Sequence, residues 1–139
     1  MRVGNIKMII DASVALSWVI PGENSELADQ IKASILSHGA IVPQLWIYEI
    51  GNALLMSVRH KRIKKSSLFG IYQALQTLPI EVEIAPPPGG HLEVLRLASE
   101  SELTVYDATY LELAIRKALP LATFDKSLQV AVRKYNLEL

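Results

Sequence analysis

Four acidic residues of this chain have the side chain and the surroundings to do chemistry: Asp11, Glu49, Asp107 and Asp125. Two unit charges about 5 Å apart repel by roughly 3 kcal/mol at an effective dielectric constant of 20, so four converging carboxylates would raise one another's pKa values unless a cation were present. A metal ion held by carboxylates activates a water molecule and stabilises charge on a phosphoryl group. Convergence of these acids would therefore predict phosphodiester hydrolysis.

The other metal-binding residue types narrow the choice of ion. The 139 residues include no cysteine, and the three histidines, His38, His60 and His91, lack the paired spacing of a zinc site. Carboxylate oxygens suit hard cations. The sequence therefore favours Mg²⁺ or Mn²⁺ over Zn²⁺.

Three of the acids also have a purely structural explanation. Asp11 and Asp125 each follow a short apolar run, and taken singly each is better explained as a helix N-cap. Asp107 precedes a helical pattern, where the helix dipole favours an acid in the first turn. For these three residues, the sequence leaves capping and catalysis both open.

Glu49 is harder to explain structurally, because it lies in the apolar half of a long helical pattern, where an unpaired charge is costly. Arg59 and Arg62 are ten or more residues further along the same helix, too far to form a salt bridge with Glu49 within it. Asn52, three residues after Glu49, places an amide on the same helix face. That amide could hold the carboxylate in one orientation.

Short apolar runs alternate with amphipathic stretches, and they predict the elements that position the acids. Strands are expected at Ile6 to Ile10, Ala40 to Val42, Val82 to Ile84 and Leu121 to Thr123, with Leu137 to Leu139 as an added edge strand. Helices are expected at Ser13 to Val19, Ser25 to Ser37, Leu45 to Arg62, Ser66 to Leu78, His91 to Ser99, Tyr106 to Ala118 and Lys126 to Tyr135. This alternation predicts a three-layer α/β/α sandwich with a parallel central sheet of four or five strands.

In such a sheet, ligands collect at the carboxyl ends of the strands. Asp11 follows the first predicted strand, so it is expected at the edge of the site.

The composition sets the domain count and the cellular setting. A chain of 139 residues fits one domain, residues 1–139, and half of its residues are hydrophobic, which favours a covered sheet and self-association. Fourteen basic residues balance fourteen acidic ones, so no global charge indicates a nucleic-acid or membrane partner. The lack of cysteine and of any apolar run of membrane-spanning length leads us to expect a cytoplasmic protein.

Four segments together carry a family resemblance: IIDASV at Ile9 to Val14, YEIGNAL at Tyr48 to Leu54, LTVYDATYLELA at Leu103 to Ala114, and LATFDKSL at Leu121 to Leu128. In this order they resemble the PIN-domain ribonucleases, and among these the short VapC toxins of bacterial and archaeal toxin–antitoxin pairs. The likeness covers nearly the whole chain from Ile6. Two departures are visible: residues 1–7 form a possible N-terminal extension, and the segment Pro86 to Gly90 is rich in proline.

The resemblance implies that Asp11, Glu49, Asp107 and Asp125 bind Mg²⁺ or Mn²⁺ and are catalytic. It also implies supporting roles for Ser13, Asn52 and Thr123. The implied activity is endoribonuclease cleavage of structured RNA, inhibited by a cognate antitoxin whose tail blocks the site. Homodimers are usual in such proteins.

An acidic pocket repels RNA, so cations must flank it. The candidate RNA-binding residues are Arg59, Lys61, Arg62, Lys64 and Lys65, five cations within seven positions. The alternative is a helix C-terminus that favours basic residues and solvates them.

Aromatic residues offer a second candidate surface. Trp18 and Leu16 could line a groove for a partner peptide, whereas Trp46 is expected in the core.

A non-catalytic α/β module is the main alternative function. A receiver-like domain would need an adjacent acidic pair after the first strand and an acceptor aspartate after the third, but the chain has Ile10-Asp11-Ala12 and Ile84-Ala85-Pro86 there. A phosphatase of the haloacid dehalogenase type would need a second aspartate where Ser13 stands. A degenerate PIN-like scaffold is a third alternative, and the presence of all four acids argues against it.

Overall fold

A four-stranded parallel sheet forms the centre of the computed structural model, which describes residues 3–139. Its strands are β1 (Met8–Ile10), β2 (Ala40–Pro43), β3 (Ile80–Glu83) and β4 (Leu121–Ala122), in the order β3-β2-β1-β4. Ile9 pairs with Ile41 on one side and with Leu121 on the other. Each residue of β1 is fully buried, as expected for a central strand covered on both faces.

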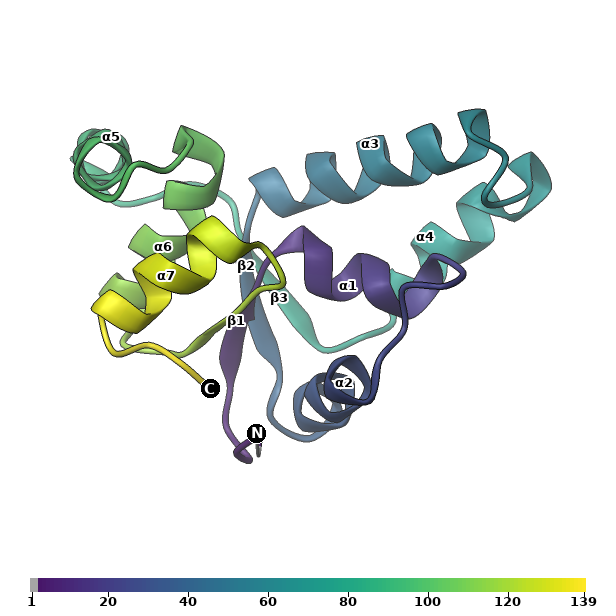
Figure 1. The fold of residues 1–139 in the computed structure, drawn as a ribbon, viewed down its shortest axis with the longest axis horizontal. Helices are drawn as coiled ribbons and strands as arrows, with labels where there is room; N and C mark the ends of the chain where they lie inside the picture. Colours follow the sequence, from purple (N-terminus) through teal and green to yellow (C-terminus); the bar gives the residue numbers. More distant parts are fainter. Residues whose placement is uncertain (1–2) are drawn as a thin grey trace.

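Helices cover both faces of the sheet (Figure 1), which confirms the predicted three-layer α/β/α sandwich. The chain moves outward from β1 to β2 to β3 and then returns to β4 on the other side of β1. Right-handed crossovers therefore place the two sets of helices on opposite faces. The first set is α1 (Ala12–Val19), α2 (Glu26–His38), α3 (Leu45–Arg59) and α4 (Leu68–Gln76), and the second is α5 (Gly90–Ser101), α6 (Val105–Lys117) and α7 (Lys126–Lys134).

The helix boundaries differ from the sequence predictions at the α3–α4 connection. The helix expected to reach Arg62 ends at Arg59, because Lys61 adopts a left-handed backbone with φ of 59°. Ser67 stands at the start of α4 but makes no capping hydrogen bond through its side chain, and the short 3₁₀ helix η1 (Lys65–Ser67) leads into α4 instead. By contrast, Ser25, where the second helix was expected to begin, caps α2 by accepting a hydrogen bond from the backbone N–H of Ala28.

Two predicted strand segments lie outside the sheet. Ile84, expected in the third strand, is 76% exposed and follows the end of β3. The predicted edge strand Leu137 to Leu139 does not form: the backbone N–H of Leu121 donates to the Leu137 carbonyl at 3.0 Å, but the segment is not paired as a strand. One such contact covers the β4 edge without extending the sheet.

The segment before β1 packs on α2. The hydroxyl of Ser34 lies 3.0 Å from the Gly4 carbonyl oxygen and 3.3 Å from that of Ile6. Val3 packs against the core. Residues 1 and 2 of the possible extension 1–7 lie outside the described residues, and Ile6 precedes β1 rather than belonging to it.

Within residues 3–139, every helix falls short of the length and apolar character needed to cross a membrane.

Candidate active site

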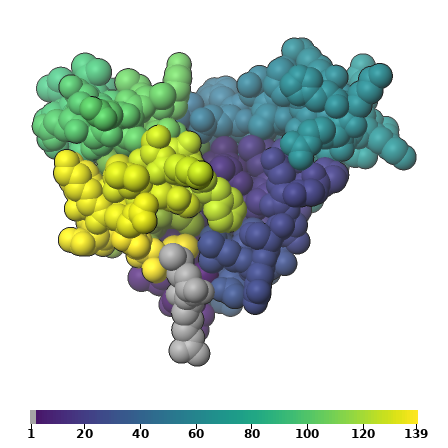
Figure 2. Space-filling view, in the orientation of Figure 1, coloured from purple at the N-terminus to yellow at the C-terminus, as the bar shows by residue number. Residues whose placement is uncertain are grey.

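The strands β1 and β4 are neighbours whose following helices leave toward opposite faces of the sheet (Figure 1). Ligand sites of open α/β sheets lie at such a switch point, outside the carboxyl ends of the strands. The space-filling view shows a hollow between the α3–α4 lobe and the α5–α6 lobe at this end of the molecule (Figure 2). The fold therefore predicts a ligand site in this hollow.

Asp11 follows β1 and fills the helix-capping role, one of the two explanations that the sequence left open. Its carboxylate caps α1 by accepting from the backbone N–H of Val14 at 3.3 Å. The hydroxyl of Ser13 donates to the Oδ1 atom at 2.5 Å, and the hydroxyl of Thr123 donates to the Oδ2 atom. Only 5% of Asp11 is exposed, so these three donors replace the water that burial removes.

The same two hydroxyls bind the β4–α7 loop to the start of α1. The backbone N–H of Phe124 donates to the Ser13 hydroxyl, and that of Asp125 donates to the Thr123 hydroxyl, each at 3.0 Å. Ser13 and Thr123 therefore fix Asp11 relative to the loop that carries Asp125.

Asp107 and Asp125 occupy the helix starts predicted from the sequence. Asp125 caps α7, accepting from the backbone N–H of Leu128 at 2.9 Å. Asp107 is in the first turn of α6, and its backbone N–H donates to the hydroxyl of the N-cap residue Thr104 at 3.0 Å. Local helix chemistry thus places both acids at the carboxyl edge of the sheet.

Glu49 is held by a residue that the sequence reasoning did not identify. The hydroxyl of Tyr110, on α6, donates to the Glu49 Oε1 atom at 2.5 Å. Tyr110 is 1% exposed, so this bond crosses from one helical layer to the other at a buried position. Asn52, expected to orient Glu49, is exposed and makes no hydrogen bond to it. The available signal was the spacing of Tyr110, three residues after Asp107, which places both on one side of α6.

Electrostatic repulsion connects all four acids. Burial raises the pKa of Asp11, against the lowering effect of the Ser13 and Thr123 hydrogen bonds, and the charge of Asp107 raises it further. Burial also raises the pKa of Glu49, and the charges of Asp11 and Asp107 add to the effect.

Burial and the charge of Asp125 raise the pKa of Asp107. The structure therefore brings Asp11, Glu49 and Asp107 near one another, and Asp125 joins them through Asp107.

The acids supply the oxygen donors that a hard divalent cation prefers. In residues 3–139 no three acidic or histidine side chains are arranged so that they could hold an ion together. However, one oxygen of Glu49 and one of Asp125 accept no hydrogen bond from these residues. Carboxylate oxygens are the ligands that Mg²⁺ and Mn²⁺ prefer, and a bound cation would offset the repulsion among these acids.

The five candidate RNA-binding cations lie at the far end of α3 and in the turn that follows. Arg59 is ten residues from Glu49, about 15 Å along the helix. Lys61, Lys64 and Lys65 are exposed. Arg62 instead donates to the Pro21 carbonyl at 3.0 Å and pairs with Glu23 at 3.4 Å, which fastens the turn to the end of α1.

The two tryptophans are both structural. Trp46 is 2% exposed, which confirms its expected place in the core. The Trp18 indole N–H donates to the Ala28 carbonyl at 2.9 Å and its ring lies under the Lys32 ammonium, so it joins α1 to α2 rather than lining a groove. Leu16 does line a groove, between α1 and α3.

The parallel sheet and the interacting carboxylates at its switch point define an α/β protein with an acidic site. The model of the PIN domain family matches residues 8–134, and the chain belongs to this family. PIN domains are generally nucleases and usually use divalent metal ions.

Among solved structures, the crystal structure of PAE2754 from Pyrobaculum aerophilum is similar, with a TM-score of 0.68 and 28% sequence identity over 89% of this chain and 83% of that one. No curated protein matches the chain significantly.

Proposed function

We propose that this protein is a Mg²⁺- or Mn²⁺-dependent endoribonuclease that hydrolyses phosphodiester bonds in structured RNA. The observation that carries the proposal is the placement of Asp11, Glu49 and Asp107 at the carboxyl edge of the sheet, close enough for their charges to interact. A fold that gathers buried like charges loses stability unless a cation offsets them.

The side chains around the acids prepare them to bind that cation. The hydroxyls of Ser13 and Thr123 favour the ionised form of Asp11, and the hydroxyl of Tyr110 does the same for Glu49. These bonds also restrict the rotation of both carboxylates, so little reorganisation is needed on binding. A bound ion would supply Lewis acidity toward a phosphoryl oxygen and lower the pKa of water.

The exposed cations at the α3–α4 turn support RNA as the substrate. Arg59, Lys61, Lys64 and Lys65 form an exposed positive surface that begins about 15 Å along α3 from Glu49, where it can bind phosphates of a folded RNA without neutralising the site. The separation favours an RNA with structure extending beyond the cleaved bond.

The groove between α1 and α3 supports a toxin role with a cognate antitoxin as partner. It has a volume of about 590 Å³ and is lined by apolar residues that include Leu16, Ile20 and Met56. Ser13, whose hydroxyl donates to Asp11, is among the lining residues, so a peptide seated in the groove would lie next to the acidic site. Binding there would block the nuclease.

Exposed apolar side chains support the homodimer. Leu92 and Leu95 of α5 are 72% and 57% exposed. A surface of this kind favours association between copies.

The proposal is tested by titrating Mg²⁺ into the purified chain and assaying cleavage of bulk RNA. Asp11→Asn should lower the cleavage rate by about 10³-fold, because the interaction of a metal with its ligands contributes several kcal/mol to catalysis. Asp29→Asn makes the same chemical change on the exposed first turn of α2 and should leave the rate unchanged. Equal rates for the two variants, or no cleavage by the parent chain at any metal concentration, would favour a non-catalytic PIN-like module.

A further inference from the structure

A second pocket lies beside the acids, and the proposed hydrolysis does not use it. It is a cavity of about 230 Å³ between the start of α3, the end of β3 and the α5–α6 pair. Its polar lining residues include Gln44, Glu83, His91, Tyr106 and Arg116. Pockets for drug-sized ligands measure ~300–1,000 Å³, so this cavity suits a single ring system.

Its position relative to the acids follows from the register of α6. Tyr106 immediately precedes Asp107, and Thr109 immediately precedes Tyr110, so the residues that line the pocket and those at the acidic site form adjacent stripes of one helix. Gln44 lines the pocket directly before α3, the helix that carries Glu49. A strand of nucleic acid with one phosphate at the acids would therefore place a neighbouring nucleotide over the pocket.

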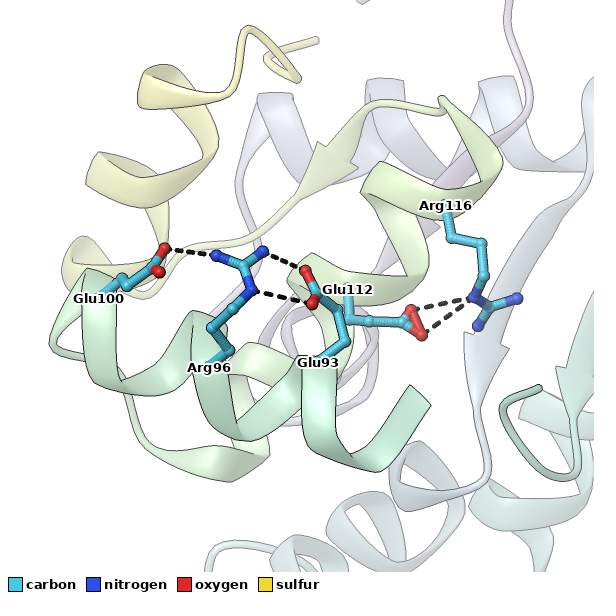
Figure 3. A network of polar contacts seen from close by, with 5 residues as sticks. All are labelled: Glu93, Arg96, Glu100, Glu112 and Arg116. Atoms are coloured by element: carbon cyan, nitrogen blue, oxygen red, sulfur yellow. Dashed lines mark hydrogen bonds and ion pairs between the residues drawn. The ribbon is translucent and has the colours of Figure 1, made fainter. Parts of the chain in front are cut away.

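The floor of the pocket is fixed by ion pairs. The guanidinium of Arg116 donates to both oxygens of Glu83, at 2.9 and 2.6 Å, and to both oxygens of Glu112, at 3.0 Å. Figure 3 shows the pair of Glu112 and Arg116 along α6. Glu112 is only 4% exposed, so this pair is bound into the core and not free to turn outward.

The proline-rich loop supplies a rigid wall. Pro86 lines the pocket and lies so close to Gly90 that a Cβ atom at position 90 would be 2.6 Å from the Pro86 Cβ. Glycine is therefore required at the start of α5 for the loop to close against this side of the cavity. The sequence departure at Pro86 to Gly90 thus has a structural role at the pocket.

The charges of the pocket select its ligand. Two carboxylates, Glu83 and Glu112, face one guanidinium, and Arg116 holds the pKa of Glu83 below its usual range. The carboxylate oxygens of Glu83 and Glu112 can accept from the N–H donors of a ligand, and they disfavour phosphate. The ring of Tyr106, 62% exposed at the rim, offers a face on which a base can stack.

We propose that this cavity, the base pocket, binds an unpaired nucleobase that carries an exocyclic amine, stacked on Tyr106 with its amine toward Glu83. This proposal rests on the proposed function, because the base in the pocket would belong to the nucleotide next to the phosphate that is cleaved. It excludes uracil as the preferred base, since uracil has no exocyclic amine.

The experiment measures fluorescence anisotropy of labelled pentacytidylate and pentauridylate with the full-length Asp11→Asn chain in Mg²⁺, so that neither probe is cleaved. Because every base in each probe is the same, binding register does not matter. Pentacytidylate should bind at least about fivefold more tightly than pentauridylate. Tyr106→Ala should weaken pentacytidylate binding about tenfold. Tyr106→Phe should bind pentacytidylate as tightly as the chain that keeps Tyr106, because stacking needs only the ring.

Val105→Ala is the matched control, because Val105 is the exposed neighbour of Tyr106 and does not line the pocket. Equal affinity for the two probes, binding of neither, or an equal loss in the Val105 and Tyr106 variants would overturn the base pocket. None of these results depends on cleavage by the parent chain, which tests the nuclease separately. A cytidine preference in a chain that cleaves no RNA would overturn the nuclease and support the pocket.

Discussion

The carboxyl edge of β1 and β4 and the α3–α4 hairpin are built in opposite ways. At the edge, Asp11 is buried and receives hydroxyl donors from two separate segments. In the hairpin, α4 buries only Leu75, and Phe69 is 75% exposed. The edge is held by several buried polar bonds, whereas α4 of the hairpin buries little and leaves its surface exposed to a partner.

This difference assigns separate tasks to the two regions. Metal chemistry needs carboxylates held in one geometry, and the hydroxyls of Ser13, Thr123 and Tyr110 provide that restraint. Recognition of a large RNA tolerates movement, because phosphate contacts from exposed lysines do not depend on one rigid arrangement. The same chemical substitution should therefore have a larger effect on stability or metal binding at the edge than in the hairpin.

The largest difference is expected between two threonines. Thr123→Val keeps the shape of the side chain but removes a donor to the buried Asp11 and the acceptor for the Asp125 N–H. It should lower the free energy of unfolding by about 1–3 kcal/mol. Thr77→Val removes an exposed hydroxyl at the end of α4 and should change it by less than about 0.5 kcal/mol. Urea denaturation measures both values, and equal losses would contradict the contrast between the regions.

A pair of tyrosines tests the same contrast through metal binding. Tyr110→Phe keeps the buried ring but leaves the Glu49 carboxylate without its donor, so Mn²⁺ affinity should fall about tenfold. Tyr72→Phe, on α4, removes a hydroxyl that makes no hydrogen bond within residues 3–139 and should leave the affinity unchanged. Isothermal titration calorimetry compares the variants. Unchanged Mn²⁺ binding by Tyr110→Phe would show that Glu49 needs no support.

The smallest effect is a pH-dependent gain in stability of the metal-free protein. The folded state raises the pKa values of Asp11, Glu49 and Asp107, so it binds more protons than the unfolded chain just above the ordinary carboxyl range. Stability contributed by these groups is therefore present at low pH and lost as pH rises through their folded pKa values. Asp107→Asn removes one charge and its repulsion of the other two, which should stabilise the chain at neutral pH.

The gain from Asp107→Asn should stay below about 1 kcal/mol, because Asp107 is partly exposed and its charge is screened. Thermal unfolding in EDTA between pH 4 and pH 7 should show the variant's advantage growing with pH. Glu83 has a lowered pKa, so its contribution to stability is lost as pH falls rather than as pH rises. Because Glu83 is present in both proteins, its contribution cancels when their stabilities are compared. An advantage that is constant with pH, or one that Mg²⁺ does not remove, would contradict repulsion at the edge.

Most of the fold follows from local sequence patterns. The four strands and seven helices of residues 3–139 match the predicted apolar runs to within a few residues. Where a predicted element or boundary was wrong, long-range contacts or the backbone conformation determined the structure instead. Leu137 to Leu139 has the composition of a strand, but the chain covers the β4 edge with a single backbone contact there. The end of α3 is set by the left-handed backbone of Lys61, which no side-chain pattern indicated.

The sequence by itself determined which residues could carry charge at strand ends and helix starts. Asp11 and Asp125 cap their helices through bonds to residues three positions away, and such local bonds are encoded by spacing alone. Only the tertiary structure decided which side chains hold the acids in place and which pocket lies next to them.

The bond from Tyr110 to Glu49 spans 61 positions, and that from Thr123 to Asp11 spans 112. The base pocket likewise combines the start of α3 with β3, α5 and α6. Contacts between segments so distant in the chain depend on how the layers pack, and no local pattern in the sequence specifies that packing.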